Sequence, residues 1–153
     1  MERLICMVIG YVFGLFQTSY IYGKMHGIDI RKCGSGNAGT TNMLRTLGTK
    51  AGAITLLGDA FKCVIAVLVV RTLFYGRYAE ILPLLSIYTA AGVILGHNFP
   101  FYMNFRGGKG IAATAGLIMS MSWQMTLLGI AVFGITVALT HYVSLGSLLV
   151  YIG

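Results

Sequence analysis

The chain has 153 residues, of which 57% are hydrophobic and only 10% are charged, and its formal net charge is +7. A soluble domain has about 25% charged residues, so this composition excludes an ordinary water-soluble fold. We predict an all-α integral membrane protein, a polytopic helical bundle in which residues 1–153 form a single domain.

Three apolar segments run approximately from Leu4 to Tyr22, from Ala51 to Val70 and from Ile81 to Leu95. A helix of about 17–25 apolar residues crosses a bilayer, so each segment is predicted to cross once, the short third one with the help of its flanks. The first segment could instead be a secretory signal. It is too long for the apolar region of a signal and has no small-residue cleavage site, which favours a membrane anchor.

Two polar segments each combine several glycines with cations. The first is Arg31–Asn42, and the second runs from Gly96 to Pro100 and on through Phe105–Gly110. Glycine lets backbone N–H groups approach a ligand closely, and Lys and Arg supply the charge that binds an anion. We therefore predict phosphate binding by the following residues: Ser35, Gly36, Asn37, Gly39, Thr41, Asn42, Arg45, His97, Asn98, Gly107, Gly108, Lys109 and Gly110.

Asn42 and Arg45 are three residues apart and would share a face if a helix starts near them. An Asn or Thr at that start would cap the helix, whose free N–H groups favour a phosphate. His97 is interpreted as a structural residue that bonds backbone groups and fixes the turn that Pro100 continues, rather than as a general base.

Asp59 and Lys62 lie within the second apolar segment, where ionised groups are costly. Residues three apart share a helix face, so the two side chains are predicted to pair. A pair that holds helices in register and a pair with a functional role are both compatible with this spacing.

The distribution of charge predicts the orientation in the membrane. The loop from Lys24 to Lys50 has five cations and one acid, and the second polar segment adds Arg106 and Lys109. If the three apolar segments each cross once, both polar segments lie on one side, which then carries a net charge of +6. The positive-inside rule places that side in the cytoplasm and the N-terminus outside.

Residues 111–140 form a further apolar stretch that is harder to interpret. One helix of this length would extend about 45 Å, which is long for a membrane span. A polar cluster at Ser120, Ser122, Trp123 and Gln124 interrupts it near the middle. We favour a hairpin of two half-depth helices, which returns His141 to the cytoplasmic side, over a single helix.

The chain ends at Gly153 inside another apolar run that begins at Tyr142. About a dozen apolar residues cannot span a bilayer alone. Either the chain is naturally short or it is a fragment of a longer protein, and we expect a fragment.

Several familiar motifs are excluded. Gly34-x-Gly36-x-x-Gly39 matches the dinucleotide fingerprint, but no strand precedes it. Gly110 follows Lys109 where a Walker A motif requires Ser or Thr, and neither a His-x-x-x-x-Asp pair nor a Gly-x-Ser-x-Gly elbow is present. The three cysteines are scattered, so no disulfide framework, metal site or cofactor is expected.

Three motifs carry a family resemblance: Gly34-Ser-Gly-Asn-x-Gly-x-Thr-Asn42 with Arg45, Gly96-His-x-Phe-Pro100 with Phe105-x-Gly-Gly-Lys-Gly110, and Val143-Ser-Leu-x-Ser147. In their order and spacing, over almost the whole chain, these motifs resemble those of the bacterial acyl-phosphate:glycerol-3-phosphate acyltransferases. The resemblance implies a bundle of seven membrane helices with the N-terminus outside. About five to six of these helices, some short or half-spanning, are represented here.

The activity implied is transfer of a fatty acyl group from acyl phosphate to the 1-hydroxyl of sn-glycerol 3-phosphate, which gives lysophosphatidic acid and phosphate and starts phospholipid biosynthesis. By motif, Ser35, Arg45 and Lys109 would be catalytic, and Ser144 or Ser147, of which we prefer Ser147, would line the substrate site. Family members continue through a further polar element that contributes to the site. Nothing here matches that element, so the C-terminal part is expected to be missing.

The resemblance also implies the surroundings of the protein. It would be a multi-pass protein of the bacterial inner membrane with its active site at the cytoplasmic face. Its partners would be its two substrates and the lipid bilayer, with the enzyme that produces acyl phosphate as a candidate protein partner and no nucleic acid.

Acyl phosphate is a mixed anhydride with a good leaving group, so positioning and electrostatic stabilisation could carry most of the catalysis. We hypothesise that a substrate phosphate, not a side chain, takes the hydroxyl proton. The alternative function is a small membrane transporter or channel for phosphorylated anions, because broken glycine-rich helices around cations would serve that role too. The absence of two matching internal halves in the sequence disfavours it.

Overall fold

The computed structural model describes residues 1–152, and the side chains of residues 1–150. The described residues are helical and irregular, with no strand. The α-helices are α1 (Glu2–Gly14), α2 (Thr18–Met25), α3 (Thr40–Leu47), α4 (Thr49–Tyr78), α5 (Leu82–Asn98), α6 (Ile111–Met121), α7 (Trp123–Thr140) and α8 (Val143–Ile152), and short 3-10 turns lie at η1 (Ile30–Lys32), η2 (Ala79–Ile81) and η3 (Phe101–Met103). The prediction of an all-α bundle is confirmed.

The first apolar segment is broken into α1 and α2, because the backbone at Gln17 is extended, with φ −103° and ψ 92°. The last carbonyl groups of a helix have no partner within it and need other donors. Here the amide of Gln17 donates to Gly14 O, the hydroxyl of Tyr102 donates to Leu15 O, and the ammonium of Lys62 donates to Phe16 O. The side chain of Gln17 itself and side chains from two other parts of the chain therefore stabilise the break.

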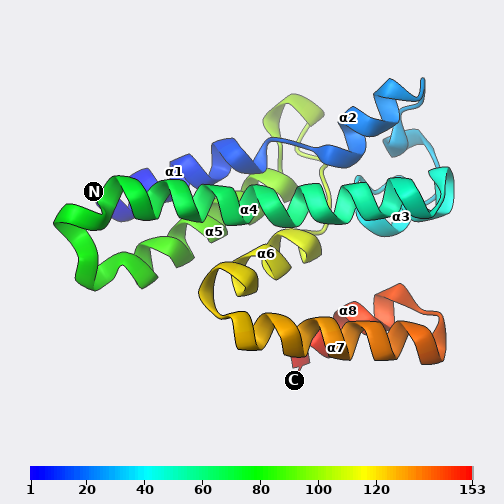
Figure 1. The fold of residues 1–153 in the computed structure, drawn as a ribbon. Helices are drawn as coiled ribbons and strands as arrows, with labels where there is room; N and C mark the ends of the chain where they lie inside the picture. The colour runs from blue at the N-terminus through cyan, green and yellow to red at the C-terminus, as the bar shows by residue number, and fades with distance from the viewer. Residues whose placement is uncertain (153) are drawn as a thin grey trace.

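The long helices run back and forth along one axis (Figure 1). The N-terminus and the α4–α5 connection lie at one end of the bundle, whereas α2, α3 and the segment that leads into α6 lie toward the other (Figure 1). Both glycine-rich segments therefore follow the ends of α1 and α5 that lie away from the N-terminus, as the alternation of membrane spans predicted.

Close glycine contacts join α1 to α5. A Cβ on Gly10 would collide with the backbone of Thr89, and one on Gly92 would collide with the backbone of Met7. Small residues let helix backbones approach closely, which is how membrane helices gain van der Waals contact without a hydrophobic driving force between them. This contact fixes the end of α5, and so the start of the second polar segment, against α1.

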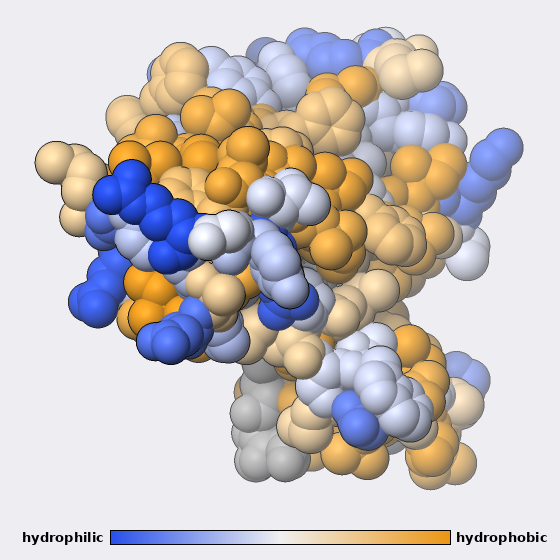
Figure 2. Space-filling view, turned by 60° about the vertical axis from the view of Figure 1, so that its left-hand side comes forward, coloured by the Kyte–Doolittle hydropathy of each residue, from blue (hydrophilic) through white to orange (hydrophobic). Residues whose placement is uncertain are grey.

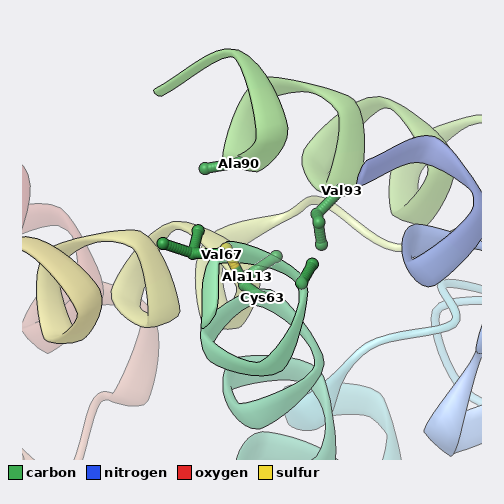
Figure 3. Close-up of a cluster of buried hydrophobic side chains, with 6 residues drawn as sticks. Cys63, Val67, Ala90, Val93 and Ala113 are labelled. Carbon is green, nitrogen blue, oxygen red and sulfur yellow. The ribbon is translucent and has the colours of Figure 1, made fainter. Parts of the chain in front are cut away.

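The centre of the bundle is a cluster of small and medium side chains from three helices (Figure 3). It contains Cys63, Ala66 and Val67 of α4, Ala90 and Val93 of α5, and Ala113 of α6, all fully buried. Gly116 of α6 continues this contact, because a Cβ there would collide with the carbonyl of Ala60. The buried side chains are small, so the helices pack tightly here.

Residues 111–140 form two helices, as the hairpin interpretation predicted, and α7 runs back along α6 (Figure 1). The backbone of Ser122 is extended, and its hydroxyl caps α7 by accepting from Met125 N at 3.3 Å. The expectation that both helices reach only half the membrane depth is wrong for α7, because this break comes early and leaves α6 with 11 residues and α7 with 18.

Three helical stretches of the described residues are long and apolar enough to cross a membrane, namely residues 2–25, residues 49–103, which include α4 and α5, and residues 123–140. Apolar side chains cover much of the surface in Figure 2, and hydrophilic side chains gather in separate groups. With α1 and α2 counted as one broken segment, residues 1–152 contain six apolar segments, and α3 is an additional short helix in the first polar loop.

Candidate active site

The first glycine-rich segment is organised by Asn42, which is buried. Its side-chain oxygen accepts from Ser35 N at 2.9 Å, and its amide nitrogen donates to the carbonyls of Ile30, Cys33 and Asn37 at 3.0–3.2 Å. One side chain thus bonds to four backbone groups of the loop, with its two amide hydrogens shared among three carbonyls. The expectation that Asn42 offers its amide to a phosphate is wrong for this reason.

The predicted Asn or Thr cap of the following helix is also wrong. Gly39 occupies the N-cap position of α3, and no side chain bonds to the N–H groups there. The first N–H groups of a helix lack intrahelical partners, and their positive end attracts anions. The N–H groups at the start of α3 therefore have no side-chain cap and remain open to an anion.

The second glycine-rich segment folds back on the end of α5. Gly107 N donates to Asn98 O at 3.0 Å and Gly108 N donates to His97 O at 3.1 Å. A Cβ on Gly107 would collide with His97 O, and Gly110 adopts φ +78°, a conformation that favours glycine. Gly107 is therefore needed for close approach and Gly110 for its backbone angle.

The two segments meet in the structure. The hydroxyl of Ser19 donates to Ala38 O at 2.8 Å, and a Cβ on Gly108 would lie 3.0 Å from the same carbonyl oxygen. Met103 of the second segment packs in one buried cluster with Ile30 and Ala38 of the first. Residues separated by some seventy positions in sequence thus form one surface, as their common side of the membrane predicted.

Asp29 neutralises part of the positive charge near this surface. Its carboxylate accepts from Arg31 at 2.8 Å and lies 3.8 Å from Lys24. The hydrogen bonds from the Arg31 side chain lower the pKa of Asp29 to about 2. Asp29 therefore remains ionised at neutral pH and holds Arg31 away from other anions.

The other cations of these segments are exposed and have no acidic partner among the described residues. Arg45 of α3 and Lys109 of the second segment are exposed, and neither pairs with an acid among the described residues. Lys32, Lys50 and Arg106 are likewise exposed and unpaired in the described part of the chain. An anion at the joined segments would meet cations that no protein carboxylate neutralises.

A buried polar cluster lies directly beneath the second segment. Lys62 Nζ is 3.0 Å from Asp59 Oδ1 and 2.8 Å from the Nδ1 atom of the His97 ring. The predicted Asp59–Lys62 pair is confirmed, and Thr18 donates a hydrogen bond to the same carboxylate oxygen at 3.1 Å. The contact of Lys62 with His97 was missed, because nothing in the spacing of the two residues indicates it.

The structural interpretation of His97 holds for its backbone. Its carbonyl accepts from Gly108 N and from the amide of Gln17 at 2.9 Å, so the residue fixes the turn at the end of α5. Its side chain makes contacts that the sequence did not predict, since the ring lies between Lys62 on one side and Gly108 on the other.

Three buried side-chain oxygens have no hydrogen-bond partner among the described residues: Gln17 Oε1, Thr40 Oγ1 and Asn98 Oδ1. Buried polar atoms normally have partners, so such atoms mark places where a ligand or water completes the bonding. Asn98 was a predicted site residue. Thr40 lies in the first glycine-rich segment, beside the predicted Thr41.

The third motif lies on α8, which packs against α7 (Figure 1). The hydroxyl of Ser147 donates to Val143 O at 2.9 Å, within its own helix, and Ser144 is exposed. No hydrogen bond joins α8 to the glycine-rich segments within the described residues. The role of Ser144 or Ser147 in the substrate site stays a prediction.

The described residues contain no group of three or more His, Cys, Asp or Glu side chains that could hold a metal ion. The candidate site brings together glycine backbone, the open end of α3, exposed cations, the predicted Ser35 hydroxyl and the His97 ring. Such a set binds and orients anions.

Comparison with known proteins assigns this arrangement to a family. The family model described as glycerol-3-phosphate acyltransferase matches residues 4–153. The chain belongs to the glycerol-3-phosphate acyltransferase family.

Members of the family with close sequences come from several bacteria. The glycerol-3-phosphate acyltransferase of Clostridioides difficile (strain 630) is 49% identical over 146 residues, which cover 94% of this chain and 71% of that protein. The enzyme of the same name from Thermotoga petrophila is 44% identical over 142 residues, or 92% of this chain and 69% of that protein.

Solved structures agree with this family assignment. The crystal structure of PlsY (YgiH), an integral membrane glycerol 3-phosphate acyltransferase, in its glycerol 3-phosphate form matches 99% of this chain and 74% of that chain with a TM-score of 0.85 and 29% identity. The lysophosphatidic acid form matches with a TM-score of 0.79 and 31% identity, over 99% of this chain and 73% of that one. The predicted family and the predicted membrane fold are thereby confirmed.

Proposed function

We propose that this chain transfers a fatty acyl group from acyl phosphate to the 1-hydroxyl of sn-glycerol 3-phosphate, giving lysophosphatidic acid and phosphate. The family supports acyl transfer to glycerol 3-phosphate, and the related PlsY structures carry the names of this acceptor and this product. The observation that carries the proposal is the contact of the two glycine-rich segments, at Gly108 and Ala38, beside exposed cations without acidic partners.

Both substrates are phosphate anions, so their encounter at one site requires cations and inward N–H groups. Arg45 and Lys109 would neutralise the two phosphates, and Ser35 would donate a hydrogen bond from its hydroxyl. The N–H groups at the open N-terminus of α3 would approach the phosphate oxygens closely. The N–H groups of Gly36 and Gly107, which were predicted to do the same, already donate to Cys33 O and Asn98 O.

The protein then has little covalent chemistry to contribute to the reaction. The 1-hydroxyl oxygen attacks the acyl carbonyl carbon, the bond from that carbon to the phosphate oxygen breaks, and the hydroxyl proton passes to a substrate phosphate. Holding two anions in this geometry supplies the entropic part of the barrier, and fixed donors stabilise the charge that develops on the carbonyl oxygen.

We also propose the orientation and location implied by the charge distribution. Seven cations and one acid lie in the segments at the end opposite the N-terminus, which favours a cytoplasmic active site and an external N-terminus in a bacterial inner membrane. An enzyme that produces acyl phosphate would then deliver its product to this face.

The transporter alternative has less support. Both polar segments follow the same ends of α1 and α5, those away from the N-terminus (Figure 1), whereas substrate sites of secondary transporters lie near the middle of the membrane. Uptake of labelled glycerol 3-phosphate into sealed vesicles would support transport.

Release of phosphate from palmitoyl phosphate by the detergent-purified chain, with and without glycerol 3-phosphate, tests the proposal. Acceptor-dependent release together with formation of lysophosphatidic acid is expected, and it should be lost in the Lys109→Ala variant. Release that does not depend on the acceptor would contradict acyl transfer to glycerol 3-phosphate.

A further inference from the structure

Lys62 is a buried cation that contacts His97 in addition to its ion pair with Asp59. Its side chain is 5% exposed and that of Asp59 is 1% exposed. Four acceptors surround the ammonium: Phe16 O at 2.6 Å, His97 Nδ1 at 2.8 Å, Asp59 Oδ1 at 3.0 Å and Gly14 O at 3.4 Å. An Asp59–Lys62 pair that only held helices together would not require the contact between Lys62 and the His97 imidazole.

The contact with Lys62 determines which nitrogen of His97 carries the proton. An ammonium has three donors and no acceptor, so Nδ1 can only accept from it. A neutral imidazole that accepts at Nδ1 carries its hydrogen on Nε2. The Asp59 carboxylate beside Lys62 favours the charged form of the lysine and so favours this arrangement.

The other nitrogen faces the second glycine-rich segment. A Cβ on Gly108 would collide with His97 Nε2 and lie 2.8 Å from Cε1, so the ring edge touches this backbone. The described part of the chain offers Nε2 no hydrogen-bond partner. The Nε2 hydrogen can therefore be donated to a group bound next to Gly108, one residue before Lys109.

We propose that Lys62 is a positioning residue, which holds His97 as the Nε2–H tautomer so that this N–H donates a hydrogen bond to a phosphate oxygen of substrate bound at Gly107–Gly110. The proposal rests on the proposed function, because it assigns a ligand to the same site. It makes His97 a neutral donor and gives the intramembrane Asp59–Lys62 pair a role in substrate binding.

The alternative ligand for Lys62 is an anion bound in the groove beside it. Lys62 also lines an apolar groove of about 480 Å³ between α1 and α4, together with Val12, Phe13, Phe16, Gly58, Phe61 and Ile65. An anion in that groove would need an ammonium donor, but protein acceptors already outnumber the three N–H groups. The ammonium is therefore directed toward the protein interior and His97.

The first test reads the tautomer without any activity measurement. Long-range ¹H–¹⁵N NMR of ¹⁵N-histidine-labelled protein in detergent distinguishes a protonated Nε2 from a protonated Nδ1, and the His97→Gln variant assigns the signals. We expect a neutral Nε2–H ring in the wild type. A ring protonated at Nδ1, or at both nitrogens at pH 7, would overturn the proposal.

The second test compares two replacements of His97. The amide of Gln reaches the place of Nε2, whereas the amide of Asn reaches only that of Nδ1 and so keeps the contact with Lys62. We expect His97→Gln to keep a kcat/KM for glycerol 3-phosphate at least about tenfold above that of His97→Asn, since a misplaced donor costs up to about 100-fold. The reverse order would mean that the contact with Lys62, not the donor at Nε2, is what matters.

The third test separates positioning from stability. The Lys62→Met variant leaves Asp59 as an uncompensated buried charge, but Asp59→Leu/Lys62→Met removes both charges and restores a neutral interior. We expect the double variant to unfold near the wild-type temperature and still show kcat/KM lowered at least about tenfold, with the His97 signals shifted. Wild-type kcat/KM in a folded double variant would overturn the proposal.

These outcomes remain separate from the proposed function. If the wild-type protein shows no acyl transfer, the proposed function fails, whereas the NMR test of the Lys62–His97 contact still gives its own answer.

Discussion

The edge of the His97 ring lies against the backbone of Gly108, with so little space that a Cβ at position 108 would collide with Nε2. This contact joins the buried cluster of Asp59 and Lys62 to the glycine-rich surface that carries Lys109. A substitution in the buried cluster or in the glycine-rich surface is therefore expected to alter substrate binding.

The Gly108→Ala variant tests this contact. The added methyl group must push the His97 ring or the segment aside, and a shift of about 1 Å at a reacting centre can cost about 100-fold in rate. We expect a loss of this size in kcat/KM for glycerol 3-phosphate.

Gly76→Ala is the matched control, because a Cβ there meets nothing within 4 Å and the residue lies in α4, near the opposite end of the bundle. It should keep wild-type activity and gain up to about 1 kcal/mol in stability from the lower entropy of Ala. Equal losses of activity in both variants would show that glycine itself, rather than the ring contact, is required.

Lys109→Ala is expected to remove a cation from the substrate phosphates. A single donor to developing charge contributes about 100- to 1,000-fold in rate, so kcat/KM should fall by that amount. Arg77→Ala serves as the control, since Arg77 is an exposed cation near the α4–α5 connection at the other end of the bundle. A loss of activity in Arg77→Ala as large as that in Lys109→Ala would indicate a general effect of net charge.

Asn42→Ala should destabilise the first glycine-rich segment. Four backbone groups lose their partner, and leaving a buried polar group unsatisfied costs about 1–3 kcal/mol. We expect a lower unfolding temperature together with a raised KM for glycerol 3-phosphate. Asn104→Gly, at an exposed position with φ 56°, should change neither quantity, and unchanged stability in Asn42→Ala would contradict the organising role.

The Asp29–Arg31 pair makes a pH-dependent contribution to stability. The pKa of Asp29 is lowered from 3.8 to about 2 by the Arg31 hydrogen bonds, so the pair stabilises the folded state above pH 3.8 and is lost as the pH falls toward 2. The difference in unfolding free energy between wild type and Asp29→Asn should therefore be constant at pH 5–7 and shrink between about pH 4 and pH 2. A difference that grows on acidification would reverse the sign of the effect.

The pH dependence of the rate identifies the proton acceptor. If a substrate phosphate takes the hydroxyl proton, log kcat/KM should follow the second ionisation of the phosphate, with a pKa of about 6. His97→Gln should lower the rate at every pH but leave the shape of this profile unchanged. Disappearance of the pH dependence in His97→Gln would instead make His97 the base.

Much of the architecture could be predicted from local pattern. The apolar runs became α1 with α2, α4 and α5, and the polar cluster at Ser122 became the break between α6 and α7. The Asp59–Lys62 contact followed from the geometry of a helix, in which residues three apart lie on one face. The common side of the two glycine-rich segments followed from counting membrane crossings.

The errors arose where a side chain bonds to distant backbone. Asn42 has the composition of a phosphate donor, yet it bonds to Ile30, Cys33, Ser35 and Asn37 because the loop folds around it. Nothing in its immediate sequence distinguishes these two uses of an amide. The break of the first segment at Gln17 was missed for a similar reason, since Lys62 and Tyr102 supply the donors that stabilise it.

The sequence by itself thus determined the membrane location of the helices, the charged end of the bundle and the family motifs, because hydropathy, charge and glycine content act over short stretches of chain. Only the tertiary structure decided that Lys62 meets His97, 35 residues away, and that Gly108 rests on that ring. Such contacts depend on how tightly α1, α4 and α5 pack, and that distance is set by glycines on facing helices rather than by any one segment.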